Sequence, residues 1–179
     1  FWIGIVAAAG GLAVMAVVIE RGLFQFLYDK EHLMQLLLTF AVVLILGDLA
    51  KVIWGTDQLS VSYPDGLDGA TNLGIAYYPT YRLLLSVLGP IIAIGLWLLI
   101  DRTRWGRMTR AATQDREMLA ALGINVPAIY TSVFILGSAL AGIGGAPAAP
   151  FNSPTPGMDA TIIVECFVIV IIGGLGSLW

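Results

Sequence analysis

The sequence is poor in the residues that disulfides, metal sites and soluble surfaces require. Its only cysteine is Cys166 and its only histidine is His32, so an internal disulfide and a Cys/His zinc site are both excluded. Charged residues make up 12% of the chain and hydrophobic residues 58%, whereas an average soluble domain has about 25% and about 45–50%. So few charges cannot cover a soluble domain, and disordered chains are poor in apolar residues. The composition therefore predicts an integral membrane protein.

Motifs for catalysis and for phosphate binding are also missing. The sequence contains neither a Gly-x-Ser-x-Gly elbow nor a His-Glu-x-x-His metal pair. The glycine run at 173–177 lacks the lysine of a P-loop. The net charge of −3 and the pI near 4.9 give no sign of nucleic-acid binding. We therefore expect no catalytic residue, no metal, no cofactor and no nucleic-acid partner for this chain.

Long uncharged runs alternate with polar segments. Because a spanning helix needs about 20 apolar residues, the pattern predicts an all-α, polytopic transmembrane bundle with about five spans in one domain. The predicted spans are residues 1–19, 33–54, 80–100, 128–146 and 161–179. The chain starts at Phe1 without a basic region before the first run and stops at Trp179 inside an apolar run. We therefore expect an internal portion of a longer membrane protein.

The segments between the spans differ in character. Residues 55–79 are polar, and short strand-like pieces are expected around Gln58–Tyr63. Residues 147–158 contain four prolines and are predicted to form a loop or a re-entrant turn. Two of the nine basic residues lie in 20–32 and five lie in 101–127. The positive-inside rule therefore places these two segments in the cytoplasm, with the protein in the cell inner membrane.

The segment 113–123 within this basic region predicts a short helix. Thr113 is expected to cap it, Asp115 and Glu117 favour its positive N-terminal end, and Gly123 suits a left-handed C-cap.

An apolar side accompanies the charges of this predicted helix, formed by Met118, Leu119 and Leu122. Two interpretations follow from composition. Either the helix lies on the anionic lipid surface, or it docks into a groove of a cytoplasmic partner.

Four stretches of the chain contain sequence motifs that are similar to those of a known protein family. They are Gln114–Met118 with Leu122–Asn125, Phe134–Gly142, Val164–Val168 with Gly173–Ser177, and Leu36–Phe40. Together they resemble the permeases of branched-chain amino-acid ABC importers, over most of the chain. In the wider class of ABC importer permeases this loop often reads Glu-Ala-Ala, three residues, then Gly. Glu117 and Gly123 keep that separation, whereas Met118-Leu119 replace the alanines.

The resemblance implies that the short helix docks on a separate ABC ATPase subunit, so that this chain is not itself an enzyme. Arg116 and Glu117 would make polar contacts, and Leu122 and Ile124 would make apolar ones. The full set of implied coupling residues is Asp115, Arg116, Glu117, Leu122, Gly123 and Ile124.

The resemblance also implies the partners and the cargo. A second permease subunit would complete the pore, and a periplasmic substrate-binding protein would meet the loops 55–79 and 147–158. The cargo would be branched-chain or related amino acids, with urea and short amides as alternatives within the same class.

Two acidic residues near or inside the spans are candidates for a translocation path. Asp48 and Lys51 lie three apart on one helical face and are expected to pair locally. Glu165 lies a few residues into the fifth span, where it is either functional or a helix-end carboxylate. If either acid relays ions, the alternative is an ion-coupled secondary transporter.

Small residues mark the last two spans. Gly137, Ala141 and Gly145 recur at four-residue spacing, and a helix-packing face is favoured over a gate for them. Gly173, Gly174 and Gly176 are expected to allow close packing or a break in the helix.

Overall fold

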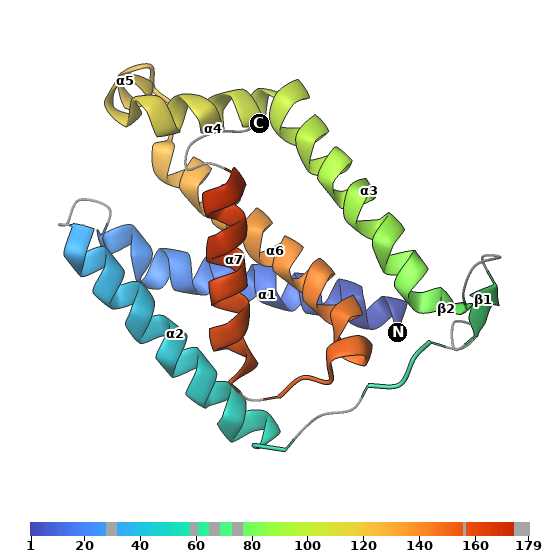
Figure 1. Ribbon diagram of the computed structural model, residues 1–179. Helices are drawn as coiled ribbons and strands as arrows, with labels where there is room; N and C mark the ends of the chain where they lie inside the picture. The colour runs from blue at the N-terminus through green and yellow to red at the C-terminus, as the bar shows by residue number, and fades with distance from the viewer. Residues whose placement is uncertain (28–31, 58–60, 65–68, 73–76, 156, 174–179) are drawn as a thin grey trace. The chain divides into compact units, whose positions relative to one another are not determined.

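The computed structural model describes residues 1–179 except 28–31, 58–60, 65–68, 73–76, 156 and 174–179 (Figure 1). The chain divides into two compact units. Unit 1 comprises Phe1–Asp29 and Ser62–Ala148, and unit 2 comprises Lys30–Val61 and Ala149–Trp179. Helices dominate both units, so the all-α class predicted from the sequence is confirmed.

Among the residues that the structure describes, four helical segments are long and apolar enough to cross a membrane. They are Trp2–Phe26, Leu33–Trp54, Thr80–Arg102 and Val126–Asn152. In element terms they are α1 (Trp2–Gly22) with the 3-10 turn η1 (Phe24–Leu27), α2 (His32–Trp54), α3 (Thr80–Arg102) and α6 (Val126–Asn152). Each pairs its backbone groups internally, as a hydrocarbon environment requires. The first four predicted spans therefore correspond to helices of the structure.

The last predicted span is covered in part. Helix α7 (Met158–Gly173) has 16 residues in the described chain, fewer than the roughly 20 that a full crossing needs. The remaining residues 174–179 lie outside the described part.

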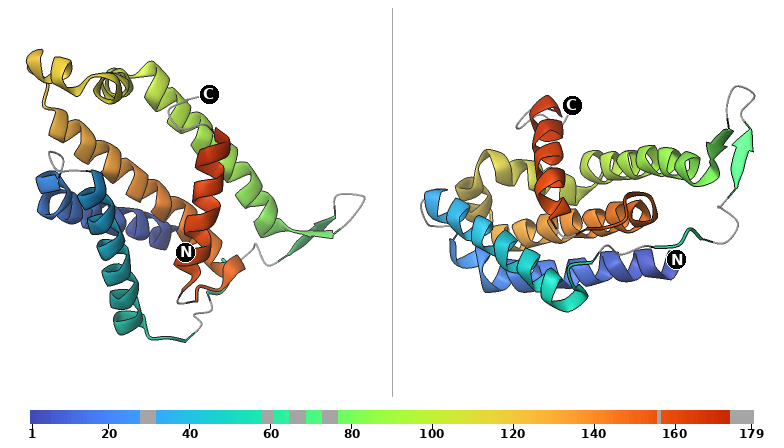
Figure 2. Two further views of the ribbon diagram at one scale, coloured as in Figure 1. Left: turned by 60° about the vertical axis from the view of Figure 1, so that its left-hand side comes forward. Right: turned by 60° about the horizontal axis from the view of Figure 1, so that its bottom comes forward.

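Within unit 1, α1 packs directly against α6, and the two ribbons run side by side in both views of Figure 2. A Cβ atom at Gly142 would lie 2.7 Å from the Cα of Ala9, so only glycine permits this approach of two helix backbones. Towards the other end of α1, the rings of Phe24 and Phe134 meet edge to face at 5.6 Å. The helices therefore run antiparallel.

The start of α3 joins the same end of unit 1 as the start of α1. Tyr81 is 1% exposed, and its hydroxyl donates a 2.5 Å hydrogen bond to the carbonyl oxygen of Pro147 in α6. The rings of Phe1 and Tyr63 contact the Tyr81 ring at 6.0 and 5.3 Å. This cluster ties the first turns of α1 and α3 to the last turns of α6.

The predicted loop at 147–158 is wrong at its beginning. Helix α6 continues through Pro147 and Pro150 to Asn152, and irregular chain begins only at Ser153. A proline inside a helix removes one backbone hydrogen bond, but membrane helices tolerate this where neighbours supply contacts. Here Pro147 is buried and its carbonyl is held by Tyr81.

The strand pieces expected around Gln58–Tyr63 are also misplaced. Residues 61–63 are not strand, and 58–60 lie outside the described residues. An antiparallel pair forms instead between β1 (Ala70–Asn72) and β2 (Tyr77–Pro79), with Thr71 opposite Tyr78. The amide and hydroxyl of Thr80 both donate to the Gly69 carbonyl, at 2.9 and 2.7 Å. The strands therefore form where the start of α3 can close the hairpin.

The predicted small-residue face on α6 has no partner within the described chain. Gly137, Ala141 and Gly145 are exposed, and a Cβ at either glycine would meet no atom within 4 Å. The same holds for Gly173, while Gly174 and Gly176 lie outside the described residues. Packing at these positions stays a prediction, and Gly142 is the position where packing is observed.

Gly142 and Gly145 offer a matched test of this α1–α6 contact. Gly142→Ala should lower the free energy of unfolding by about 1–3 kcal/mol, because the new methyl group overpacks against Ala9. Gly145→Ala should leave it unchanged or raise it by up to about 1 kcal/mol, because alanine favours helix. Unfolding of the purified protein in mixed micelles measures both, and equal effects of the two substitutions would contradict the packing.

Candidate functional site

The candidate site begins with a sharp corner at the end of α3, where Thr103 separates α3 from α4 (Arg104–Gln114). The Thr103 hydroxyl donates to the Leu99 carbonyl at 2.5 Å and accepts from the Gly106 amide at 3.2 Å. A Cβ at Gly106 would lie 2.5 Å from the carbonyl carbon of Ile100. The corner therefore needs both a capping hydroxyl and a glycine.

Two side-chain contacts hold α4 in place. Arg110 forms a 2.7 Å ion pair with Asp101 at the end of α3. The Trp105 indole N–H donates to the Ser132 hydroxyl of α6 at 2.7 Å. Because these contacts reach two different helices, they fix both the direction and the rotation of α4.

A small buried core lies beneath the next helix, α5 (Arg116–Ala121). Its buried members are Ala112, Leu119, Val126 and Ile129. We call these four residues the Leu119 cluster. Beside it, the Tyr130 hydroxyl donates a hydrogen bond to the Ala112 carbonyl at 3.3 Å. One turn from each of α4, α5 and α6 thus shares a single apolar cluster.

The ends of α5 are capped at both sides. The Asp115 carboxylate accepts from the Met118 amide at 2.9 Å, which satisfies one of the free amides of the first turn. Gly123 has φ +79°, a left-handed conformation that glycine adopts without strain, as predicted for the C-cap. The following Ile124 amide donates back to the Leu119 carbonyl at 3.3 Å.

The predicted cap at Thr113 is wrong. Thr113 belongs to α4, where its hydroxyl donates to the Arg110 carbonyl at 2.8 Å. The chain turns at Asp115, whose extended backbone ends α4 and starts α5. Asp115 lies three residues before Met118, and its carboxylate reaches the open amide that Thr113 cannot reach.

The predicted coupling residues lie in α5, drawn in yellow in Figure 1, and in the residues that directly flank it, from the N-cap Asp115 to Ile124. Arg116 and Glu117 are exposed, and Leu122 is 70% exposed. Ile124 differs, because it packs against the Leu119 cluster. Its predicted contact with a partner remains untested.

Met118 is a candidate contact residue that the sequence prediction of apolar contacts left out. It is 61% exposed and lies four positions before Leu122, a spacing that places both side chains on one helical face. One exposed apolar side chain of α5, Met118, and that of its C-cap residue Leu122 therefore project outward, whereas Leu119 of the same helix is buried.

A pocket of about 450 Å³ lies on another side of α5, since neither Met118 nor Leu122 lines it. Its walls come from α5, the start of α6 and η1, and include Glu117, Tyr130 and Gln25. The pocket shows that the turn after α1 and the α4–α5 segment lie at the same end of unit 1.

The two acidic path candidates lie elsewhere, in unit 2. Asp48 forms a 3.0 Å ion pair with Lys51, so the predicted local pair is confirmed. Glu165 lies on the exposed surface of α7. A role of either acid in a translocation path stays a prediction.

Comparison with known proteins identifies the family. The whole chain, residues 1–179, matches the family described as branched-chain amino acid transport system / permease component. The chain belongs to this family. The assignment confirms the resemblance that the four sequence stretches carry, and with four membrane-length helices it describes a multi-pass membrane transport component.

Individual relatives cover the chain to different extents. The high-affinity branched-chain amino acid transport system permease protein LivH of Escherichia coli is 23% identical over 187 residues, which cover 99% of this chain and 60% of LivH. BraD of Pseudomonas aeruginosa, with the same description, is 32% identical over 98 residues, 54% of this chain and 32% of BraD. The fructose import permease protein FrcC of Rhizobium meliloti is 34% identical over 99 residues, 54% of this chain and 26% of FrcC. The chain thus matches less than two thirds of each relative, and no solved structure matches it.

Leu119 and Leu122 test how α5 is held, since the same substitution should act differently at each. Leu119→Ala should cost about 2–5 kcal/mol of stability, because it leaves a cavity in the buried cluster. It should also speed hydrogen exchange of the amides in 115–124. Leu122→Ala should change stability by no more than about 0.5 kcal/mol, because the side chain is exposed. Hydrogen exchange of these amides is measured by mass spectrometry. If Leu119→Ala leaves their protection unchanged, the Leu119 cluster does not hold α5.

Proposed function

We propose that this chain is a permease subunit of an ATP-driven importer and that α5 is the helix on which an ABC ATPase subunit docks. The observation that carries the proposal is the exposure of Met118, in the six-residue helix α5, and of its C-cap residue Leu122, beside buried Leu119. Exposed apolar side chains that lie together mark interaction sites, and methionine is enriched at interfaces. ATP hydrolysis then belongs to the partner, and this chain supplies the moving spans.

The orientation follows from where the basic residues lie. In unit 1, Gln25 of the η1 turn lines the same pocket as Arg116 of α5, so the chain that follows α1 and the basic α4–α5 segment lie at one end of this unit. The positive-inside rule assigns that end to the cytoplasm, where ATP is available. An interfacial role for the exposed arginines at lipid headgroups is compatible with docking, because Met118 and Leu122 leave a separate apolar face.

Helices α4 and α5 are connected to the membrane helices α3 and α6. The Arg110–Asp101 ion pair and the Trp105–Ser132 hydrogen bond link α4 to α3 and α6. The Leu119 cluster links α5 to both α4 and α6. A displacement imposed on α5 by an ATPase is therefore passed to two membrane helices instead of being absorbed by a loose loop.

Other partners follow from the family. A periplasmic substrate-binding protein would engage the opposite end of unit 1, where the β1–β2 hairpin precedes α3. A second permease subunit would pack on exposed apolar helix faces, for which the face of Gly137, Ala141 and Gly145 is suited because small residues allow close approach.

The cargo we propose is branched-chain or related amino acids. LivH and BraD carry that description. FrcC is described as a fructose import permease, which makes a sugar the second candidate. Uptake of leucine and of fructose by proteoliposomes that contain the assembled importer separates the two, and ATP-dependent uptake of fructose alone would refute the amino-acid assignment.

A double substitution tests the docking face. Met118→Ala with Leu122→Ala should reduce recovery of the ATPase subunits with the solubilised permease by about tenfold or more, because two interface residues worth more than about 1 kcal/mol each are lost. ATP-driven uptake should fall in parallel. The matched control is Val14→Ala with Val18→Ala, two exposed residues at the same spacing on α1, which should retain assembly. Full ATPase recovery with the first pair would refute docking through α5.

A further inference from the structure

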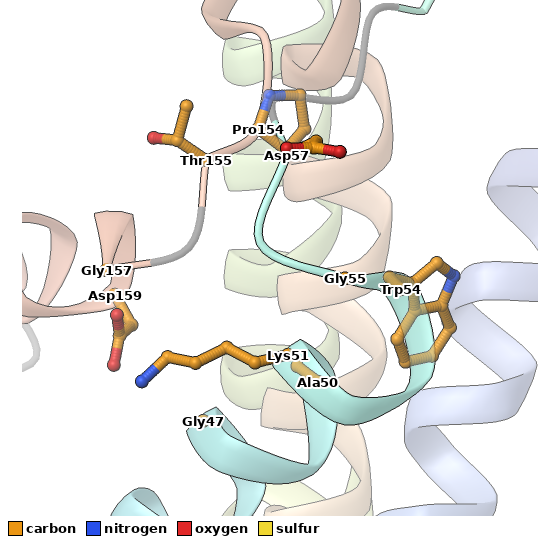
Figure 3. A pocket seen from close by; sticks show the side chains of 10 residues that line it. All are labelled: Gly47, Ala50, Lys51, Trp54, Gly55, Asp57, Pro154, Thr155, Gly157 and Asp159. Carbon is orange, nitrogen blue, oxygen red and sulfur yellow. The ribbon is translucent and has the colours of Figure 1, made fainter.

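Unit 2 contains a pocket of about 430 Å³ at the end of α2 (Figure 3). One wall is formed by the last two turns of α2 with Gly47, Ala50 and Trp54. The other is formed by residues before and at the start of α7, namely Pro154, Thr155, Gly157 and Asp159. A pocket of this size accommodates a small-molecule ligand, since such sites are usually about 300–1,000 Å³.

Two glycines shape the walls. Gly55 ends α2 with φ +85°, and its amide donates to the Lys51 carbonyl at 2.9 Å. Gly157 turns the opposite wall with φ +95°, just before Asp159 enters the first turn of α7. Side chains other than glycine are strained in this conformation, so both turns of the pocket depend on glycine.

Charges of both signs face a largely apolar interior. Figure 3 shows the Lys51 side chain extended towards the carboxylate of Asp159, which lies 3.7 Å from the Cβ position of Gly47. Asp57 adds a second carboxylate to the lining, and Trp54 and Ala50 supply apolar surface. A ligand with one anionic group, one cationic group and an apolar part would match all three features.

We propose that this pocket binds the zwitterion of a free α-amino acid, with its carboxylate at Lys51, its ammonium at Asp159, and its side chain against the apolar lining that includes Ala50 and Trp54. The proposal deepens the proposed function and rests on it for the choice of an apolar amino acid. The site lies in the permease chain itself, at the C-terminal end of α2, which the orientation expected from the positive-inside rule assigns to the external side of the membrane. There it would receive cargo that a binding protein releases.

Asp48 provides a control for the proposed role of Lys51. Asp48 is bonded to Lys51 at 3.0 Å but does not line the pocket. It competes with a ligand carboxylate for the same ammonium group. Removal of the Asp48 charge should therefore leave leucine binding unchanged or strengthen it, whereas removal of the Lys51 charge should weaken it.

The experiment measures equilibrium binding of radiolabelled leucine to the assembled, nucleotide-free importer in phosphatidylcholine and phosphatidylglycerol nanodiscs without the binding protein. Lys51→Met should weaken leucine binding by about 10–100-fold, as expected for the loss of a charged hydrogen bond. Lys51→Arg should restore most of it, and Asp48→Asn should not weaken it. Equal losses with Lys51→Met and Asp48→Asn would overturn the proposal.

Ligands that lack one charge identify which group each residue recognises. Leucinol has no carboxylate, so its weaker binding should be the same in wild type and Lys51→Met. The acid 4-methylpentanoate has no ammonium, so its binding should not fall further with Asp159→Asn. A Lys51→Met loss as large for leucinol as for leucine would show a structural effect only and would overturn the assignment.

A lipid headgroup shares the chemistry of a primary ammonium beside an anionic group. Glycerophosphoethanolamine should displace leucine poorly, and displacement as strong as that by unlabelled leucine would reassign the pocket to a lipid. ATP-driven leucine uptake with the binding protein present is measured on the same samples. Uptake without pocket binding would overturn this inference alone, whereas pocket binding without ATP-driven uptake would overturn the proposed function.

Discussion

Burial of Leu119 against Ala112, Val126 and Ile129 is the contact on which the α4–α5 end of unit 1 depends. A helix of six residues has too few internal hydrogen bonds to be stable in isolation, because helix nucleation is costly. Its stability comes instead from the buried leucine and from caps at both ends. The same arrangement leaves Met118 and Leu122 facing outward, so the residue that anchors α5 also determines which side chains it presents.

Further contacts in unit 1 connect the anchored helix α5 to the membrane spans. Hydrogen bonds and an ion pair join α4 to α3 and α6 near one end, while Tyr81 joins α3 to α6 near the other end. Gly142 brings α1 within backbone contact of α6. Lipid supplies little hydrophobic force between helices, so close packing and polar contacts of this kind hold them together. Helices tied at both ends move as one body when either end is displaced.

The helices could be predicted from the sequence, but the details of their ends could not. Uncharged runs of about 20 residues identify spans because hydrocarbon forces the backbone into helix. The prediction that α6 ends before Pro147 was wrong, because proline normally ends a helix. Here the helix continues, and the Tyr81 hydroxyl of α3 donates to the Pro147 carbonyl. Thr113 and Asp115 are both good caps by type, and only the turn at Asp115 decides between them. Lys51 and Asp159 are far apart in sequence, so no motif indicated their shared pocket.

Cysteine labelling at position 122 tests most directly whether α5 is a cytoplasmic docking surface. Residues 1–179 contain a single cysteine, so Cys166→Ser provides a background in which Leu122→Cys is the only thiol of this segment. A membrane-impermeant maleimide should label it in inside-out vesicles without ATPase subunits, and bound ATPase should block the reaction. Labelling from the external side of intact cells, or labelling that the ATPase leaves unchanged, would contradict the docking role of α5.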